Sequence, residues 1–203
     1  MKQVSTKFYV NKFNFYKNAE KFDLNFVPPI LRRRMSLLDK YALSSMNNVY
    51  SDDIEHIVFS SQFGEVERLL KIIGQYTTEK EVSPNTFSGS VHNFAVGFFL
   101  LNKQKPVPYT ALSACEKSLT FGLLSAITSK YDNLLFCYAD ANCGINNSLA
   151  LNISKERQDN SAKFVLKYGK HNNTDSAFDE FTDFFGGKTK LITTPDYSIE
   201  RID

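Results

Sequence analysis

The residue whose type and setting most favour covalent chemistry is Cys115. It follows a short run, Tyr109 to Leu112, that is typical of a strand, and it precedes a Leu-rich run typical of a helix. A helix N-terminus lowers the pKa of a thiol, and a sharp turn from strand to helix exposes the side chain to an incoming ester. Cys115 is therefore a candidate nucleophile. The competing interpretation is core packing, because cysteine is often buried.

Two polar residues, His92 and Asn93, interrupt an otherwise small and apolar stretch from Phe87 to Leu101. Polar groups in a buried helix need hydrogen-bonding partners, so a structural role is the favoured interpretation. A base for Cys115 is the alternative.

Other site chemistries have little support. His56, His92 and His171 are scattered, HExxH is absent and the cysteines lack ligand spacing, so we expect no metal site. Neither GxGxxG nor a Walker loop occurs, and Gly186-Gly187 suits a helix end, so we expect no cofactor. Three consecutive arginines, Arg32 to Arg34, suit an acidic partner or a phosphate, with a solvated helix face as the more ordinary alternative.

Composition restricts the class of protein. At 203 residues, with 42% hydrophobic and 23% charged residues, the chain suits one globular domain. The net charge of +2 is too balanced to indicate nucleic-acid binding. The chain has no signal-peptide pattern and no apolar run near the roughly 20 residues that span a bilayer. With three cysteines, Cys115, Cys137 and Cys143, and no CxxC pair, we expect a reduced, cytoplasmic protein in which the glycosylation-like triplets at Asn146, Asn152 and Asn172 have no role.

Hydrophobic patterning predicts alternating strands and helices, typical of the α/β class. The predicted strands are Lys7 to Phe15, Ile54 to Phe59, Tyr109 to Leu112, Leu134 to Tyr138, Phe164 to Tyr168 and Leu191 to Thr193. The predicted helices are Ile30 to Val49, Val66 to Gly74, a mostly buried Phe87 to Leu101, Leu119 to Ile127 and a short Phe-rich helix after Ser176. Ala141 to Asn160, rich in Asn, Ser and Asp, is predicted to be a surface excursion.

Several motifs, in this order, resemble the beta-ketoacyl synthase-like N-terminal domain family. They are Arg34-Met35-Ser36, Ser60-Ser61-Gln62-Phe63-Gly64-Glu65, Ser83-Pro84-Asn85-Thr86-Phe87, Ser90-Val91-His92-Asn93, Ala111-Leu112-Ser113-Ala114-Cys115 and Leu134 to Asp140. The resemblance implies a single domain over residues 1–203, with a matching core at about 28–140 and a looser C-terminal extension. It also implies one half of a thiolase-type fold, a mixed sheet covered by helices, in which the Leu119 to Ile127 helix is buried and Gly122 allows close packing.

The same resemblance aligns Cys115 with the nucleophile of full ketosynthases. Those enzymes take two further catalytic histidines from a C-terminal half, and nothing after Asp140 supplies them here, because His171 lies in a polar loop. We therefore do not expect condensation by this chain alone.

Relatives of this domain include chain length factors, the non-catalytic partners of ketosynthases in fatty-acid-like, polyketide or aryl polyene pathways. The resemblance implies a ketosynthase partner, with an interface or acyl tunnel formed by His92, Asn93, Phe94, Phe98, Tyr109 and Leu112. Arg32, Arg33 and Arg34 are then candidates for contact with an acyl carrier protein. Two alternatives stay open: an independent acyltransferase or thioesterase that uses Cys115, and a stand-alone homodimeric binding protein.

Overall fold

A computed structural model describes residues 5–142, 144–171 and 177–202. Within them, eight strands form one mixed sheet in the order β3-β2-β4-β5-β1-β6-β8-β7. The strands are β1 (Ser5–Lys17), β2 (His56–Ser60), β3 (Tyr109–Leu112), β4 (Asn133–Asn142), β5 (Ile145–Ser154), β6 (Ala162–Tyr168), β7 (Leu191–Thr193) and β8 (Tyr197–Arg201). The helices are α1 (Pro29–Arg32), α2 (Leu37–Val49), α3 (Val66–Glu79), α4 (Pro84–Ser88), α5 (Phe94–Lys103), α6 (Ser118–Ile127) and α7 (Phe178–Phe185). Cys143, Asn172 and Ser176 lie outside the described residues.

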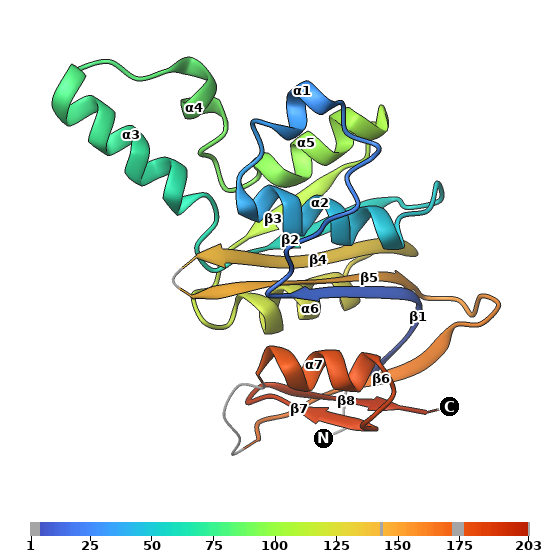
Figure 1. The fold of residues 1–203 in the computed structure, drawn as a ribbon. Helices are drawn as coiled ribbons and strands as arrows, with labels where there is room; N and C mark the ends of the chain where they lie inside the picture. The colour runs from blue at the N-terminus through green and yellow to red at the C-terminus, as the bar shows by residue number, and fades with distance from the viewer. Residues whose placement is uncertain (1–4, 143, 172–176, 203) are drawn as a thin grey trace.

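Helices cover both faces of this sheet (Figure 1). α2 and α5 pack on one face, against apolar side chains such as Ile57 of β2 and Leu135 of β4. α6 and α7 pack on the other face, where Phe136 of β4 and Phe164 of β6 are fully buried. β2 is parallel to both β3 and β4, whereas the remaining neighbours are antiparallel. The predicted mixed sheet covered by helices is confirmed.

Helix α6 confirms the expected close packing behind Cys115. Leu119, Leu123 and Ala126 are buried, and so is Gly122. A Cβ atom on Gly122 would overlap the Ser60 side chain of β2 and lie 2.9 Å from Phe136 Cε2. Only glycine lets the helix approach the sheet this closely.

The predicted helix from Ile30 to Val49 is wrong in its continuity, because it is two helices. Ser36 begins α2: its hydroxyl accepts from Asp39 N at 3.0 Å, and its own N–H donates to Asp39 Oδ2 at 2.9 Å. This reciprocal capping satisfies N–H groups at the start of α2 and separates it from α1.

Two further helix predictions need correction. The helix predicted to end at Gly74 continues to Glu79, and none of its residues is buried. The stretch from Phe87 to Leu101 is not one buried helix, since residues 89–93 form turns between α4 and α5. Together α3 and α4, residues 66–88, form an arm that projects from the sheet (Figure 1).

The surface excursion predicted for Ala141 to Asn160 is also wrong, because its middle is the central strand β5. Two of its polar residues, Ser148 and Asn152, are buried and hydrogen-bonded to α2. Ser148 Oγ donates to Tyr41 O at 3.2 Å, and Asn152 Nδ2 donates to Val49 O at 3.0 Å. These polar side chains therefore serve as hydrogen-bonding partners of α2 and are not exposed to solvent. Strand β8 was not predicted.

Candidate functional site

Cys115 lies on a tight turn between edge strand β3 and helix α6. Its backbone φ is 51°, the left-handed conformation that is uncommon outside glycine, and its side chain is exposed. Ser118 holds the turn: its hydroxyl accepts from Ala114 N at 2.9 Å and donates to Cys115 O at 2.7 Å. The strand-to-helix junction and the outward thiol thus follow the sequence prediction.

A second loop, residues 61–64 after β2, supports this turn. Asp140, fully buried at the end of β4, accepts from Ser61 Oγ at 2.6 Å, Gln62 N at 2.9 Å and Phe63 N at 3.0 Å. Ser113 Oγ then donates to Gln62 O at 3.1 Å, which joins the loop to the Cys115 turn. Asp140 is a positioning residue that sequence reasoning did not single out, although it lies in a family-like motif.

Four of the predicted interface residues are brought together in pairs. The Nε2 atom of His92 is 2.9 Å from Leu112 O, and Asn93 Nδ2 donates to the Tyr109 hydroxyl at 2.8 Å. Both bonds tie the start of α5 to β3. The His92 ring lies so close to Gly64 that a Cβ there would be 2.7 Å from Nδ1, and Gly64 has a φ of 56°. His92 and Asn93 therefore have the structural hydrogen-bonding role that their apolar surroundings indicate.

The chemical machinery around the thiol is sparse. Among the described residues, none is hydrogen-bonded to the Cys115 thiol, and the Nε2 atom of His92 is engaged by the Leu112 carbonyl. Cys137 is fully buried, and burial raises the pKa of its thiol far above its usual value. No group of three or more described His, Cys, Asp or Glu side chains is placed to hold a metal ion. Within the described part of the chain, the turn therefore presents a thiol that has no hydrogen-bonded base.

Apolar side chains surround the free edge of β3. Phe94 stacks on Phe98, with ring centroids 5.4 Å apart, and a shallow hollow of about 300 Å³ lies between α5 and Tyr109. Leu101, at the C-terminal end of α5, is 77% exposed. The predicted interface residues thus belong to one continuous region formed by β3 and α5.

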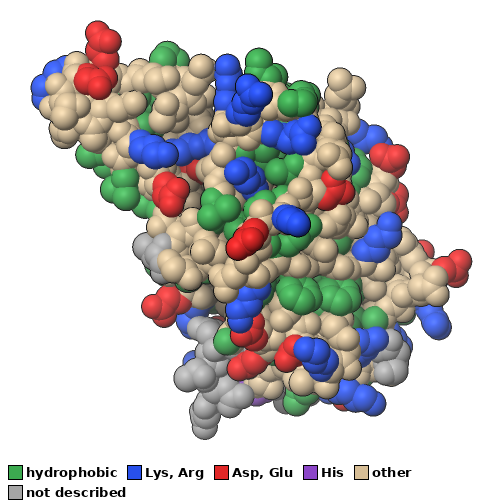
Figure 2. All heavy atoms as spheres, viewed as in Figure 1, with side chains coloured by type: hydrophobic (Ala, Val, Ile, Leu, Met, Phe, Trp, Pro, Cys, Tyr) green, Lys and Arg blue, Asp and Glu red, His purple; other side chains and the backbone are tan. Residues whose placement is uncertain are grey.

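The arm carries a second apolar surface, which sequence reasoning missed. Leu69, Leu70, Ile73 and Tyr76 recur at helical spacing on α3, and each is about half exposed or more. Figure 2 shows hydrophobic side chains on the lower side of the projecting arm. The periodicity was visible in the sequence, but it does not reveal whether a face is covered by the chain's own core.

The triple arginine lies at the end of α1 and in the turn that follows. Arg33 and Arg34 are exposed, whereas Arg32 is half-buried. Lys and Arg side chains gather between α1 and the base of the arm (Figure 2). This surface is some distance in sequence from Cys115, and no described contact joins the two.

A buried charged cluster lies beneath the same surface. Arg68 of α3 pairs with Asp39 Oδ2 at 2.6 Å and with Glu65 at 3.3 Å, and it donates to the carbonyls of Gly89 and Arg34. Burial, and then the neighbouring Asp39, raise the pKa of Glu65 to about 8, against the opposing effect of Arg68. Burial also raises the pKa of Asp39, against the opposing effect of Arg68, so both carboxyl groups of the cluster hold a proton more strongly than free carboxylates do.

Residues 9–144 match the family described as the beta-ketoacyl synthase N-terminal domain. The chain belongs to this family. The match begins nearer the N-terminus than the motifs at 28–140 indicated, and residues 145–203 of this ketosynthase-family chain lie beyond it. A search of curated proteins gives no match.

Two solved structures share the fold of this ketosynthase-family chain. The first is the ketosynthase ApeO in complex with its chain length factor ApeC from Xenorhabdus doucetiae, with a TM-score of 0.70, 19% identity, and coverage of 90% of this chain and 84% of the matched chain. The second is a beta-ketoacyl synthase from Burkholderia phymatum STM815, with a TM-score of 0.56, 11% identity, and coverage of 85% and 58%. At these identities the likeness establishes the fold, which is that of thiolase-like ketosynthases. None of the described helices is long and apolar enough to cross a membrane.

Proposed function

We propose that this chain is a chain length factor, a ketosynthase-like accessory subunit that pairs with a full-length beta-ketoacyl synthase in fatty-acid-like, polyketide or aryl polyene biosynthesis. The main support is the face formed by edge strand β3, helix α5 and the arm, which exposes apolar side chains to solvent. A matched chain of similar length in a complex of a ketosynthase with its chain length factor supports the assignment.

The free edge of β3 is the first element of the proposed interface. On its inner side, Pro108 O accepts from Ile57 N at 3.1 Å, and Leu112 O accepts from Ser61 N at 3.3 Å. Because the backbone groups of alternate residues face opposite sides of a strand, those of Tyr109 and Ala111 face outward. An unpaired edge of this kind is a template for a strand from another chain.

Apolar burial is the second element. Leu101, Tyr109 and Val91 are exposed beside this edge, and the α3 stripe extends the apolar surface along the arm. Exposed apolar surface that spans several elements is typical of protein–protein interfaces. A partner seated on β3 and α5 would place Phe94, Phe98 and the His92 to Asn93 turn at the joint surface. In this proposal they shape the tunnel for the acyl chain.

The absence of a base beside Cys115, among the described residues, fits a non-catalytic subunit. A thiol at a helix N-terminus can be reactive without a complete catalytic site, since condensation also needs groups that activate the donor and stabilise the charge that develops. We assign that chemistry to the partner's active site.

Arginines 32 to 34 are proposed to recruit an acidic acyl carrier protein. Because Arg33 is exposed, Arg33→Glu should slow association with the carrier protein by about tenfold at low salt, and the effect should shrink at high salt. Lys188→Glu, near the opposite edge of the sheet, is the control. Equal slowing by both variants would indicate only a change in net charge.

Co-purification with a full ketosynthase from the same organism tests the pairing. Ala111→Pro removes one outward N–H while the bonds from β3 to β2 remain, and Leu101→Asp places a charge on the apolar face. Each should weaken the complex at least tenfold. Leu191→Asp, at an exposed leucine on the far edge strand β7, should leave it unchanged. Unchanged pairing in the first two variants would contradict the proposed interface.

The exposed thiol and left-handed backbone of Cys115 favour a second candidate function, an independent acyltransferase or thioesterase. In that case, Cys115 takes an acyl group from a carrier protein or coenzyme A, and Cys115→Ala abolishes both labelling and product formation. A stable homodimer without a ketosynthase partner would instead indicate a stand-alone binding protein.

A further inference from the structure

Arg68, in the first turn of α3, is the one side chain of residues 66–88 that forms hydrogen bonds or ion pairs with described residues outside the arm. We propose that Arg68 anchors the arm in a fixed direction, so that the apolar stripe of α3 contacts the ketosynthase partner. The contact with the partner rests on the proposed function, whereas the anchor concerns this chain alone.

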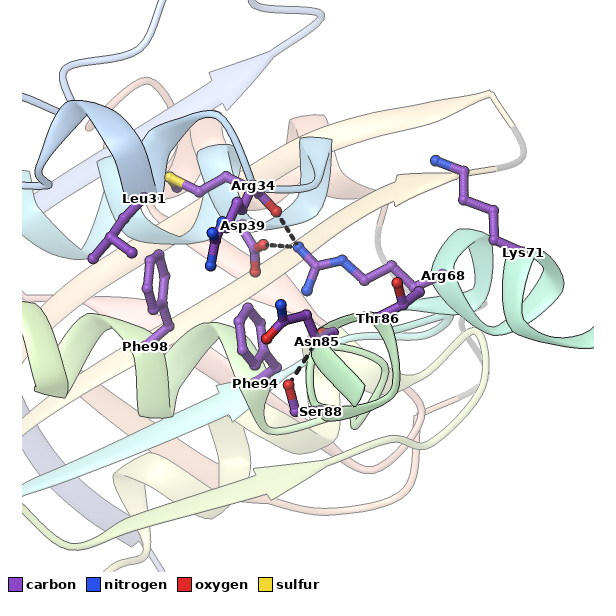
Figure 3. Close-up of a pocket in the computed structure, with 11 residues that line it drawn as sticks. Leu31, Arg34, Asp39, Arg68, Lys71, Asn85, Thr86, Ser88, Phe94 and Phe98 are labelled. Atoms are coloured by element: carbon purple, nitrogen blue, oxygen red, sulfur yellow. Dashed lines mark hydrogen bonds and ion pairs between the residues drawn. The ribbon is translucent and has the colours of Figure 1, made fainter. Parts of the chain in front are cut away.

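The Arg68 guanidinium is enclosed by segments that are distant from it in sequence. It pairs with Asp39 Oδ2 of α2 at 2.6 Å and donates to the Arg34 carbonyl oxygen at 3.0 Å (Figure 3). It also donates to the Gly89 carbonyl oxygen, between α4 and α5, at 2.8 Å. The side chain is only 13% exposed. One arginine therefore joins the base of the arm to α2, to the turn before it and to the turn before α5.

The chain leaves space for this guanidinium at Gly89. A Cβ atom on Gly89 would overlap Arg68 Nη1 and lie 3.1 Å from Arg68 Cζ. The φ of Gly89 is −85°, which other residues adopt freely, so the backbone does not require glycine here. The Phe94 ring lies against the same guanidinium, with 4.7 Å from Cζ to the ring centroid. The surroundings of Arg68 are thus shaped around its side chain.

Helix α3 depends on this anchor, because none of its 14 residues is buried. A helix of this length is marginal in water when it packs against nothing. With 3.6 residues per turn, Leu69, Ile73 and Tyr76 lie about 80–140° around the helix axis from Arg68. Fixing Arg68 therefore fixes the rotation of the helix and the direction in which the stripe faces.

The anchor also connects the stripe to the proposed interface. Phe94, which contacts Arg68, lines the shallow hollow beside Tyr109 together with the exposed Val91. The arm therefore adjoins the surface of β3 and α5 on which we seat the ketosynthase. If the arm moved freely, it would be in the binding position for only part of the time, and the apparent affinity would fall by that fraction.

Amide hydrogen exchange of the full chain tests the anchor. Arg68→Lys keeps the charge but loses the fork of guanidinium donors, and Gly89→Ala places a methyl group in the space of the guanidinium. Each variant should speed exchange in residues 69–79 by about tenfold, because the helix frays without its anchor. Glu67→Gln, at an exposed neighbour on the same helix, should exchange as the wild type does.

Co-purification of the same variants with the ketosynthase tests the contact with the partner. Arg68→Lys and Gly89→Ala should each weaken the complex by about tenfold. Ile73→Asp should weaken it as much without faster exchange, because it places a charge on the stripe and leaves the anchor in place. Glu67→Gln should pair as the wild type does.

Unchanged exchange in both Arg68→Lys and Gly89→Ala would overturn the anchor. Faster exchange in these variants, with normal pairing in them and in Ile73→Asp, would overturn the contact between the arm and the partner and leave the proposed function intact. A wild-type chain that pairs with no ketosynthase would contradict the proposed function, and exchange would still decide the role of Arg68. Exchange in the buried strand β4 should stay at the wild-type rate, which separates release of the arm from loss of the fold.

Discussion

Gly122→Ala tests how tightly helix α6, and with it the Cys115 turn, packs on the sheet. The new methyl group would lie 2.7 Å from Ser60 Cβ and 2.9 Å from Phe136 Cε2, both in the buried core. Overpacking of this kind costs about 1–3 kcal/mol, and the higher helix propensity of alanine returns about 0.5–1 kcal/mol. We therefore expect the free energy of unfolding to fall by about 1–2 kcal/mol.

Urea unfolding followed by circular dichroism measures this change, and the chain supplies a matched control. Gly74 is also inside a helix, but nothing lies within 4 Å of a Cβ built there. Gly74→Ala should leave the stability unchanged or raise it by up to about 1 kcal/mol. A Gly122→Ala variant as stable as the wild type would refute the packing argument.

A double-mutant cycle adds a stricter check on the same contact. The Ser60 hydroxyl is buried and has no hydrogen-bonding partner among the residues that the structure describes. Ser60→Ala removes this hydroxyl, whose oxygen is the atom nearest to the new methyl group. Gly122→Ala should therefore cost less in the Ser60→Ala background. Additive effects would place the strain elsewhere.

Three further predictions concern other groups. The folded-state pKa of Glu65, about 8, lies above the ordinary value of 4.5. Its contribution to stability is therefore complete below about pH 4.5 and is lost as pH rises through 8. In Glu65→Gln, the free energy of unfolding, measured with urea between pH 5 and 9, should fall less with pH than it does in the wild type. Asp140→Asn should lower the free energy of unfolding by about 2–4 kcal/mol, because a buried amide replaces an anionic acceptor of three hydrogen bonds, and amide exchange at Gln62 and Phe63 should accelerate; unchanged exchange would contradict its positioning role. Cys115→Ala should leave the product profile of the ketosynthase complex nearly intact, and loss of product would favour the independent enzyme.

Much of the fold could be predicted because apolar periodicity reports local structure directly. The six predicted strands and the helix behind Cys115 follow from it. Strand β5 was not predicted because Ser148 and Asn152 are residue types typical of loops. Their hydrogen bonds to α2, which make burial possible, depend on the tertiary structure. The break before α2 had a readable signal, Ser36 with Asp39 three residues later, but the apolar stripe ran through it.

The site was predictable only where its parts are near each other in sequence. The turn at Cys115 is local, so strand, cysteine and helix could be ordered from the sequence alone. The hydrogen bonds that Asp140 accepts from residues 61–63 join segments almost eighty positions apart, and neither segment contains a pattern that predicts this contact. The exposure of the α3 stripe depends on what the rest of the chain leaves uncovered, which periodicity does not contain.

Intact-protein mass spectrometry of the purified ketosynthase complex, after incubation with an acyl donor, tests the central claim most directly. If this chain is an accessory subunit, the acyl group is found on the full-length ketosynthase, and the mass of this chain is unchanged. The same reaction with this chain alone gives no acylated species. An acyl adduct on this chain that Cys115→Ala removes, together with product formed without any partner, would contradict the account.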